Sequence, residues 1–586
     1  MAVPIPGGVS EPTVPFEASS MAPPAATQAS KLDTILILGG YGVFGGRLAE
    51  LLSDLDGLEL LVCGRDLAKA TDFCRRYEGR ARVRAMRVDR RDMAHVLATE
   101  RPGLVVDASG PFQDCGDRPY AVIEACIDAG IDYVDFADAA DFVFGVASLD
   151  ERAKAAGVFA LSGVSSFPVL TAAVLRELAR GMDIVSVQGG IAPSPYAGIG
   201  LNVMRAVVGY AGAPVKLWRD GKPGQGTGLA ESMRFTIAAP GKLPLRNIHF
   251  SLVDVPDLQV IPPEHPTMTD IWMGAGPVPE VLHRILNLLA KARHRLRLPS
   301  LEPLSPLFYR VLNLMRFGEH RGGMFVRARG HADGQPVERS WHLLAEGDDG
   351  PYIPSMAIEA IVRKLIKGER PAAGARPATR ALELADYDAL FANRSIHTGF
   401  RADDATAPLY RRVLGNAFDT LPATLQALHG IAGHRQWRGH ADVRHGSGIL
   451  ARIVRALVGF PKAGSHVPVT VTFTPEADGA ERWTRSFGFR DFSSLQALGR
   501  GRGAHLLTER FGVASFALAL VVDNGRLALV PRRWSVLGIP MPRFLLPRGV
   551  SHEYEADGRF HFDVEISAPL VGLIVHYQGE LQPRTS

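Results

Sequence analysis

The feature that most constrains this chain is a cluster of glycines directly after a short apolar run. Residues 34–38 are apolar at all positions but the first, and the seven residues that follow are Gly39-Gly40-Tyr41-Gly42-Val43-Phe44-Gly45. Three of the glycines have the G-x-G-x-x-G spacing, in which a tight turn lets the backbone approach a pyrophosphate and a helix then opens with free N–H groups. The loop therefore predicts a strand–loop–helix unit that binds a dinucleotide.

Beyond the loop, strand-like and helix-like segments alternate as far as residue 165. We expect strands at 34–38, 58–63, 82–88, 104–107, 133–136 and 158–162. Helices are expected at 46–55, 66–77, 119–129 and 150–156. Strands that alternate with helices at this spacing are typical of a doubly wound parallel sheet. Residues 32–165 are therefore predicted to form an α/β domain of the Rossmann type.

The end of the second predicted strand bears on which dinucleotide is bound. In NAD sites of this fold, an acidic residue about 20 positions after the loop binds the ribose hydroxyls. The chain instead has Cys63-Gly64-Arg65 there, and an arginine neutralises a 2′-phosphate that a carboxylate would repel. Asp66 is the nearest acid, and its position suits a helix N-cap. The sequence therefore favours NADP over NAD.

Two further segments are expected at the carboxyl edge of the sheet, where ligands bind in open α/β folds. Asp89 follows the third strand, where such folds often contact adenine, although a plain loop residue explains it equally well. Ser109, Gly110, Pro111 and Phe112 follow the fourth strand, and the small residues among them leave room for the nicotinamide ribose. We therefore include these five residues in the predicted cofactor site.

The run VVDASGPFQDCGDRPYAVIEACIDAGIDYVDFAD, which begins at Val105, resembles the saccharopine dehydrogenase NADP-binding family. The later segments FALSGVSSFPVL, IAPSPYAGIG and MFVRARGHADG extend the likeness to about residue 395. The resemblance implies a Rossmann domain followed by an α+β domain that holds substrate and often forms dimer contacts. The chain departs from the family at Asp107 and at Ala137-Asp138-Ala139, where members often have Asn and Thr-Gly-Glu. Saccharopine is therefore not implied as the substrate.

The region 166–400 is predicted to be the α+β domain for substrate binding or dimerisation. Strands of an antiparallel sheet are expected at 184–191, 232–236, 324–329 and 339–344, with helices at 203–209 and 279–297. The apolar helix 355–366 is expected to pack back on the Rossmann domain, and the proline- and glycine-containing stretch 371–377 is interpreted as a loop or linker.

A third domain is predicted at 408–583, and it is rich in β-structure. Apolar residues alternate strictly in several segments, and Asp523-Asn524-Gly525 and Asp557-Gly558 are strong hairpin turns. We expect a sheet with one apolar face that a few helices cover. Landmarks such as Trp483-x-Arg485-x-Phe487 are similar to those of an uncharacterised domain that is found fused to this family, which implies a fusion partner and no particular reaction.

Hydride transfer to a carbonyl or imine needs a proton donor near the nicotinamide. The Tyr-x-x-x-Lys pair of short-chain dehydrogenases is absent, since no tyrosine has a lysine four positions later. Asp135 and Asp138 lie at the end of a predicted core strand and are the candidate catalytic residues. Asp135 is equally well explained by a structural role in which it binds backbone amides.

No metal site is predicted. Four histidines recur about five residues apart in the third region, whereas ligands on a helix prefer a spacing of four, and no HExxH or Cys/His pairing is present. These histidines are His429, His434, His440 and His445. We expect them in loops or in the core.

Composition limits the partners and the location. The 65 basic and 61 acidic residues leave a net charge of +4, too balanced for nucleic acid as the main partner. The four cysteines form no C-x-x-C pair and no apolar run is long enough to span a membrane, so a cytoplasmic protein is expected. Residues 1–31 have the composition of a disordered tail. The basic amphipathic helix at 279–297 leaves two alternatives, a peripheral membrane contact or the cover of a core or homodimer interface.

Together these features predict an NADP-dependent oxidoreductase that transfers a hydride to or from a carbonyl or imine of a small-molecule substrate, whose identity the sequence does not give. The alternative is a non-catalytic dinucleotide-binding protein whose C-terminal domain binds a lipid-like ligand or a partner.

Overall fold

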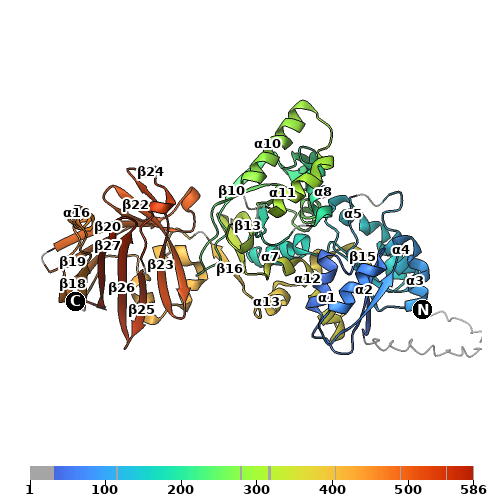
Figure 1. Ribbon diagram of the computed structural model, residues 1–586, viewed down its shortest axis with the longest axis horizontal. Coiled ribbons are helices and arrows are strands. Elements are labelled where there is room, and N and C mark those ends of the chain that lie inside the picture. The colour runs from blue at the N-terminus through green and yellow to red at the C-terminus, as the bar shows by residue number, and fades with distance from the viewer. Residues whose placement is uncertain are drawn as a thin grey trace, which may run out of the picture.

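The computed structural model describes residues 32–584, with short gaps at 114–115, 199, 278–279, 315–317, 403, 489 and 550. Figure 1 shows three parts in a row: an N-terminal α/β domain in blue, a middle domain in green and yellow, and a β-rich C-terminal domain in orange and red. The predicted tail at 1–31 lies outside the described residues.

The N-terminal domain is built on a parallel sheet of seven strands in the order β15-β6-β5-β4-β1-β2-β3. The strands are β1 (Thr34–Leu38), β2 (Glu59–Gly64), β3 (Arg82–Arg87), β4 (Leu104–Asp107), β5 (Asp132–Asp135), β6 (Phe159–Ser162) and β15 (Gly374–Pro377). The central strands are continuous apolar runs because a parallel sheet is covered on both faces, and Ile35 to Ile37 are fully buried. The predicted doubly wound sheet is confirmed.

The helices of this domain follow the strands in alternation, as the sequence predicts. They are α1 (Val43–Leu51), α2 (Leu67–Arg76), α3 (Met93–Glu100), α4 (Ala121–Ala129), α5 (Ala140–Gly145) and α6 (Asp150–Ala155). Helices α3 and α5 were missed by the sequence pattern; each contributes only three buried residues, so their apolar periodicity is weak.

The middle domain contains a second sheet of seven strands in the order β10-β11-β12-β7-β13-β14-β16. These are β7 (Asp183–Ala192), β10 (Ser232–Phe235), β11 (Ile248–Leu252), β12 (Asp270–Ala275), β13 (Arg321–Ala332), β14 (Gln335–Glu346) and β16 (Ile396–Ala402). The expectation of an antiparallel sheet is corrected at one pair, because β12 runs parallel to β7. The long crossover between these two strands brings the chain back in the same direction, which a hairpin cannot do.

The other elements of the middle domain surround this sheet. The helices are α7 (Thr171–Leu178), α8 (Leu201–Tyr210), α9 (Asp257–Val260), α10 (Glu280–Leu296), α11 (Ser305–Leu314) and α13 (Leu384–Phe391), and β8 (Pro214–Arg219) forms a hairpin with β9 (Lys222–Thr227). Within the described residues, none of the helices is both long and apolar enough to span a membrane.

One late segment of the chain returns to the N-terminal domain. Helix α12 (Ile353–Ile366) lies against α1, where the Ser355 hydroxyl donates to the Phe44 carbonyl at 3.2 Å. The interpretation of 371–377 as a loop or linker is wrong, because β15 lies there and pairs in parallel with β6. The sequence hid this strand because its four residues are glycine, alanine, arginine and proline, which carry no strand pattern.

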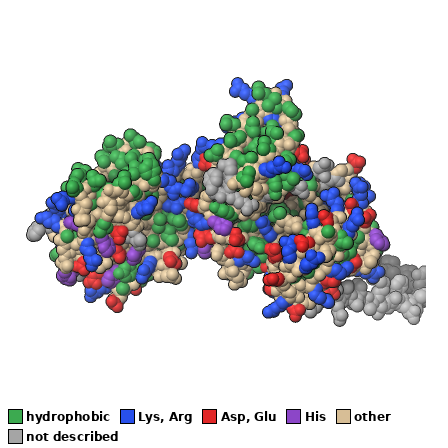
Figure 2. All heavy atoms as spheres, viewed as in Figure 1, with side chains coloured by type: hydrophobic (Ala, Val, Ile, Leu, Met, Phe, Trp, Pro, Cys, Tyr) green, Lys and Arg blue, Asp and Glu red, His purple; other side chains and the backbone are tan. Residues whose placement is uncertain are grey.

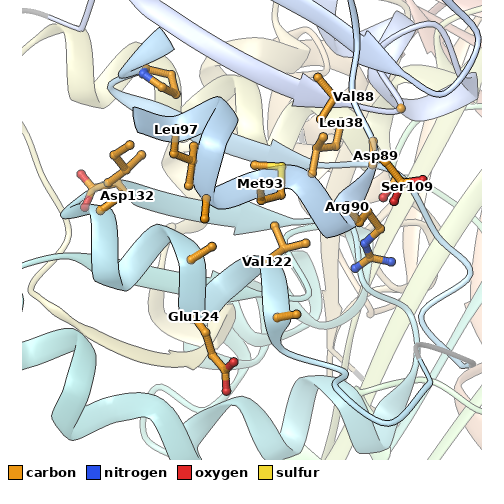
Figure 3. A pocket seen from close by; sticks show the side chains of 18 of the residues that line it. Leu38, Val88, Asp89, Arg90, Met93, Leu97, Ser109, Val122, Glu124 and Asp132 are labelled. Atoms are coloured by element: carbon orange, nitrogen blue, oxygen red, sulfur yellow. The ribbon is translucent and has the colours of Figure 1, made fainter. Parts of the chain in front are cut away.

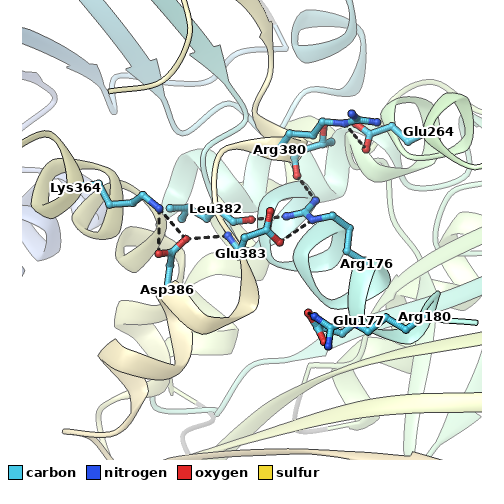
Figure 4. A network of polar contacts seen from close by, with 10 residues as sticks. Arg176, Glu177, Arg180, Glu264, Lys364, Arg380, Leu382, Glu383 and Asp386 are labelled. Atoms are coloured by element: carbon cyan, nitrogen blue, oxygen red, sulfur yellow. Dashed lines mark hydrogen bonds and ion pairs between the residues drawn. The ribbon is translucent and has the colours of Figure 1, made fainter. Parts of the chain in front are cut away.

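Ion pairs fasten the returning segment to the middle domain (Figure 4). Arg176 of α7 donates to the Glu383 carboxylate at 2.9 Å and to the Thr379 carbonyl at 2.9 Å. Lys364 of α12 pairs with Asp386 of α13 at 3.2 Å. The first two domains are thus joined by polar contacts as well as by a shared hydrophobic core.

Helices α10 and α11 belong to a lobe that protrudes from the middle domain (Figure 1). The apolar side expected for α10 consists of Leu282, Ile285, Leu289, Ala292 and Leu296. The helix buries a different set, His283, Leu286, Asn287 and Ala290. His283 and Asn287 face inward because both form hydrogen bonds with the Ser251 hydroxyl, at 2.7 and 2.9 Å. Large apolar side chains such as Leu288 stay exposed on the outside.

The C-terminal domain is an antiparallel barrel of ten strands, in which pairing between β22 and β23 closes the sheet. The strands are β17 (Arg435–His445), β18 (Gly464–Pro475), β19 (Glu481–Phe487), β20 (Arg490–Leu498), β21 (Leu507–Phe511), β22 (Ala514–Asp523), β23 (Arg526–Val536), β25 (Ser551–Ala556), β26 (Arg559–Ala568) and β27 (Gly572–Pro583), with β24 (Ile539–Pro540) beside β23. Helices α14 (Leu409–Leu414), α15 (Ala423–His429) and α16 (Ile449–Val458) complete the domain. Both predicted hairpin turns are confirmed. Closure of the sheet into a barrel was not predicted from the sequence. Alternation of apolar residues shows that a strand has an apolar face, but it does not show which strands pair with each other.

Candidate functional site

The glycine loop crosses from β1 to α1 over the carboxyl end of β2. The backbone N–H groups of Gly39 and Gly40 both donate to the Cys63 carbonyl, at 2.8 and 3.1 Å, and Gly42 N–H donates to the Gly39 carbonyl at 2.8 Å. These bonds turn the chain sharply, so that α1 starts at Val43 directly above the sheet edge.

Two of these glycines leave no room for a side chain. Gly39 has a φ of +74°, and a Cβ there would lie 2.6 Å from the Ala108 carbonyl oxygen. A Cβ on Gly45 would lie 2.5 Å from the Gly39 carbonyl oxygen and 2.8 Å from the Gly40 Cα. The loop is thus a close-packed backbone cradle, the form that lets main-chain atoms approach a pyrophosphate.

The start of α1 is open to an anion. The N-cap residue is Gly42, and within the described residues no side chain caps this end and no acid lies in the first turn. The first N–H groups of a helix have no partner inside the helix, and the helix dipole adds positive potential there. The residues therefore fit the phosphates of a dinucleotide.

Tyr41 connects the loop to the end of β2. Its hydroxyl accepts a hydrogen bond from Asp66 N–H at 3.2 Å, and its ring lies so close to Gly64 that a Cβ there would meet it at 2.4 Å. Asp66 has the N-cap position that the sequence predicts, because its carboxylate accepts from Lys69 N–H at 3.1 Å. Asp66, the acid nearest to the end of β2, is thus engaged in capping α2.

Arg65, between Gly64 and Asp66 in the chain, is exposed on the wall of the groove that contains the glycine loop. Among the described residues it has no ion-pair partner. A guanidinium free of carboxylates at the carboxyl end of β2 is available to a phosphate on the ribose of a bound dinucleotide.

The groove itself has a volume of about 2130 Å³ and extends past the glycine loop along α3 and α4. In Figure 3, Asp89, Arg90 and Ser109 lie toward one end, and Asp132 lies toward the other. Met93 lies between them. Only the end with the glycine loop has the cradle described above, so we place the dinucleotide there.

Asp89 caps the turn after β3, where its carboxylate accepts from Arg91 N–H at 3.0 Å. Asp89 also lines the groove. It can therefore serve as a structural loop residue, the alternative stated above, and still belong to the predicted cofactor site. The next residue, Arg90, donates to the Asp107 carboxylate at 3.0 Å and its guanidinium lies 5.6 Å from the centre of the Phe112 ring. Sequence reasoning missed Arg90, whose only signal was its position beside Asp89.

Asp107 organises the loop 108–112 at the end of β4. This buried carboxylate accepts from both the backbone N–H and the hydroxyl of Ser109, at 2.9 and 2.6 Å. Phe112 is buried against Phe142, with ring centres 5.2 Å apart, whereas Ser109, Gly110 and Pro111 line the groove. Asp107, where the resembled family often has Asn, therefore shapes the floor of the predicted nicotinamide region.

Asp135 is fully buried at the end of β5. One of its carboxylate oxygens accepts from Gly163 N–H at 2.7 Å, from Ala137 N–H at 3.0 Å and from the Ser162 hydroxyl at 3.1 Å. Burial raises the pKa of this carboxyl to about 7, against the opposing effect of the three hydrogen bonds. These contacts join β5 to β6, which is the structural alternative stated above. Its catalytic role stays a prediction.

Asp138 lies in the loop beyond β5 and is exposed. Gln113 donates to its carboxylate at 3.0 Å, and crowding of the carboxyl by surrounding protein raises its pKa. The charge of Asp138 affects the pKa values of two residues of the middle domain. Burial and then the charge of nearby acids, Asp138 among them, raise the pKa of Asp254 to about 6 and also raise the pKa of Tyr210.

Tyr210 ends α8 and Asp254 follows β11, so neither is near Asp138 in the sequence. Sequence reasoning missed both, and no motif marks them. The three groups form a cluster of proton-holding side chains where the first two domains meet. The raised pKa values of the two carboxyls, Asp138 and Asp254, suit them to move a proton nearer to neutral pH, whereas Tyr210 stays protonated and can only donate a hydrogen bond there.

The middle domain also reaches the start of α1. Arg47 of α1 donates to the Ala197 carbonyl at 2.9 Å and to the Pro351 carbonyl at 3.1 Å. Gly200 lies close to Val43, since a Cβ on Gly200 would be 3.7 Å from the valine side chain. The segment after β7 thus borders the phosphate end of the site.

The interior of the C-terminal barrel holds a cavity of about 160 Å³ lined mainly by aromatic and aliphatic side chains. Two of its buried carboxylates have partners: Glu509 pairs with Arg485 at 3.2 Å, and Glu553 lies in hydrogen-bond contact with His429 at 2.6 Å. Ligand pockets commonly measure about 300–1,000 Å³. This interior is therefore too small for a lipid-like ligand unless the barrel opens.

Two family models match this chain. Residues 35–161 match the model described as the saccharopine dehydrogenase NADP binding domain, and residues 421–581 match the domain of unknown function DUF4166. Both resemblances stated from the sequence are confirmed. No curated protein matches the chain.

Several solved dehydrogenases resemble part of this chain at low identity. An amine dehydrogenase from Mycobacterium smegmatis is 13% identical, with 60% of this chain and 95% of that chain covered and a TM-score of 0.32. The DAP dehydrogenase of C. glutamicum is 14% identical, with 61% and 99% covered and a TM-score of 0.29. WlbA from Thermus thermophilus, solved with NAD and alpha-ketoglutarate, is 12% identical, with 58% and 89% covered and a TM-score of 0.27. Likenesses this distant carry no argument about substrate.

The parallel sheet, the glycine cradle and the family match define the class of the N-terminal domain. It is a domain that binds a nicotinamide dinucleotide. These findings support a dinucleotide-dependent oxidoreductase. Within the described residues no group of His, Cys, Asp or Glu is arranged to hold a metal ion.

Proposed function

We propose that this chain is an NADP-dependent oxidoreductase that transfers a hydride to or from a carbonyl or imine of a small-molecule substrate. The observation that carries the choice of NADP is Arg65, which is exposed beside the glycine loop with no carboxylate partner among the described residues. Asp66 does not compete for the ribose, because it caps α2.

The chain's own residues would divide the work as follows. The cradle at Gly39 to Gly45 and the start of α1 hold the pyrophosphate, and the loop that Asp107 shapes holds the nicotinamide end. When bound, the nicotinamide supplies or accepts the hydride.

The matching proton is assigned to the carboxyls of this cluster, Asp138 and Asp254. Asp138 is the member that is exposed and closest in sequence to the carboxyl edge of the sheet. Its raised pKa favours the protonated form nearer to neutral pH than an ordinary aspartate allows, as an acid catalyst requires.

The test of the cofactor assignment is Arg65→Asp. We expect the dissociation constant for NADPH to rise by about tenfold to a hundredfold, because a carboxylate repels the 2′-phosphate, and that for NADH to change little or to fall. Fluorescence titration with each nucleotide measures both constants. Arg75→Asp on the exposed surface of α2 is the matched control and should leave both unchanged. Unchanged NADPH affinity in Arg65→Asp would refute the role given to Arg65.

A further inference from the structure

A second cleft lies where the middle domain meets the C-terminal barrel. It has a volume of about 390 Å³ and is lined from three separate parts of the chain, 234–247, 280–284 and 502–543. Among its described lining residues there is one carboxylate, Glu280, against seven arginines. These are Arg234, Arg246, Arg284, Arg502, Arg532, Arg533 and Arg543.

Two glutamates compensate only part of this positive charge. Glu280 pairs with both Arg234 and Arg284, the latter through a bond of 2.7 Å from its Nε. Glu319 accepts from Arg532 at 3.2 Å, and its carboxylate also pairs with an arginine outside the cleft. Each of these carboxylates is thus shared between guanidinium groups.

The remaining charge is concentrated on the barrel side. Arg502, Arg533 and Arg543 have no carboxylate partner among the described residues. Burial lowers the pKa of Arg533, and repulsion from Arg502 and Arg234 lowers it further. Burial and the nearby Arg246 also lower the pKa of Arg543, although the charge of Glu319 opposes them. Like charges held this close destabilise each other, and a bound anion would relieve that repulsion.

Large apolar side chains are exposed on the elements that flank the cleft. On α10, Val281 is 61% exposed and Leu288 is 67% exposed; in and around β24, Leu537 is 75%, Ile539 is 65% and Phe544 is 71% exposed. Figure 2 shows apolar side chains gathered over the α10 lobe and over the adjacent end of the C-terminal domain, with Lys and Arg side chains between the two. Contiguous exposed apolar surface commonly marks a binding surface.

We propose that the arginine cleft binds the phosphate head group of an anionic membrane lipid while the apolar side chains on both sides enter the edge of the bilayer. Guanidinium groups bind phosphate through two parallel hydrogen bonds, which accounts for the number of arginines. A free phosphorylated metabolite would explain the arginines but leaves the two apolar flanks without a role. A basic surface with apolar side chains beside it is the combination that binds anionic membranes.

The first test is co-sedimentation of the full-length protein with two kinds of vesicle. One kind contains phosphatidylcholine alone, and the other contains phosphatidylcholine and phosphatidylglycerol in equal amounts. We expect binding to the anionic vesicles to be at least about tenfold stronger than binding to the neutral ones, since each basic residue at an anionic surface adds to the attraction. Equal binding to both, or binding to neither, would overturn the proposal.

Variants test the arginines and the exposed apolar side chains of this surface separately. Arg533→Glu/Arg543→Glu should reduce binding to anionic vesicles by at least about tenfold. Arg80→Glu/Arg82→Glu makes the same change of charge on exposed residues of the N-terminal domain and should reduce it far less. Phe544→Asp should weaken vesicle binding while the cleft keeps its arginines. Thermal unfolding checks that each variant is folded; reversal of Arg533 and Arg543 removes repulsion, so it should not lower the melting temperature.

Soluble phosphate distinguishes the head group from a free ligand. Glycerol 3-phosphate at millimolar concentration should compete weakly with vesicles, because it lacks the apolar contacts. Tight binding of glycerol 3-phosphate to the arginine cleft, lost in Arg533→Glu/Arg543→Glu and without any vesicle binding, would replace the lipid with a soluble phosphorylated ligand and contradict the proposal. This inference does not depend on the proposed oxidoreductase activity.

Discussion

Two regions of this molecule are suited to phosphate, and they achieve it by different chemistry. At the glycine loop the contacts come from backbone N–H groups and a helix start, in a cradle where a single Cβ would collide with main-chain atoms. At the arginine cleft the contacts come from long side chains that three distant segments bring together. On this account the first site depends on the shape of its backbone, whereas the second depends on its net charge.

This difference decides how each site responds to change. A backbone cradle fails when its shape changes, even if no charge is altered. A charged cleft fails when its charge is altered or screened, even if its shape is kept. The following predictions test that contrast, from the largest expected effect to the smallest.

The largest effect is expected from Gly45→Ala. Its Cβ would lie 2.5 Å from the Gly39 carbonyl oxygen, so the loop must shift, and we expect NADPH affinity to fall by at least about a hundredfold. Nucleotide titration measures the change. Gly209→Ala is the matched control, because a Cβ there meets nothing within 4 Å. A variant at Gly45 that binds NADPH normally would show that the cradle is not the site.

The second effect is a pH dependence of stability at the junction of β5 and β6 in the N-terminal domain. Asp135 has a pKa of about 7 in the folded chain, so between about pH 4 and 7 the folded state holds a proton that the unfolded state has lost. Stability should therefore fall as the pH rises through this window, by up to about 1.4 kcal/mol per unit. Hydrogen exchange of peptides that span β5 and β6 measures it.

Asp135→Asn should flatten this dependence, since the amide oxygen still accepts hydrogen bonds but does not titrate. Glu151→Gln, whose side chain is 90% exposed, should leave the slope as it is. A slope of the same size in Asp135→Asn would assign the pH dependence to another group.

The third effect concerns salt. Binding of anionic vesicles should weaken by about tenfold when the ionic strength rises from about 0.1 to about 1 M, because the Debye length shortens from about 10 to about 3 Å. NADPH binding should weaken less, since the cradle relies on directed backbone hydrogen bonds. Parallel titrations at several salt concentrations compare the two slopes, and a steeper slope for NADPH would reverse the distinction drawn between the sites.

The smallest effect is expected when the arginine cleft is changed and NADPH binding at the glycine loop is measured. Arg533→Glu/Arg543→Glu should leave the NADPH dissociation constant within about twofold of the wild-type value, because Coulomb interactions between sites separated by more than a Debye length are screened. Nucleotide titration of the variant checks this. A large change in NADPH affinity would mean that the two regions are one functional unit.

The same contrast explains what the sequence predicted and what it did not. The Rossmann sheet and the cofactor loop could be predicted because the strand, the glycines and Arg65 are consecutive or follow at a fixed spacing. Asp66 as a helix cap was equally local. Strand β15 was missed because Gly374 to Pro377 have no strand pattern and are held by pairing with a strand that lies about two hundred residues earlier.

The proton cluster and the arginine cleft were missed for a related reason. Tyr210 and Asp254 come near Asp138 only through packing of two domains, and no spacing in the chain records that contact. Arg533 and Arg234 likewise come near each other only through packing of the barrel and the middle domain, although they are far apart in the sequence. The amphipathic pattern of α10 was visible, but the hydrogen bonds of His283 and Asn287 determine which face it buries.

The central claim, that the glycine cradle and Arg65 select NADP, is tested most directly by titrating the wild-type protein with NADPH and NADH side by side. We expect NADPH to bind at least about tenfold more tightly, because only it carries the 2′-phosphate that Arg65 can neutralise. Equal affinity for both, tighter binding of NADH, or no binding of either would contradict the account.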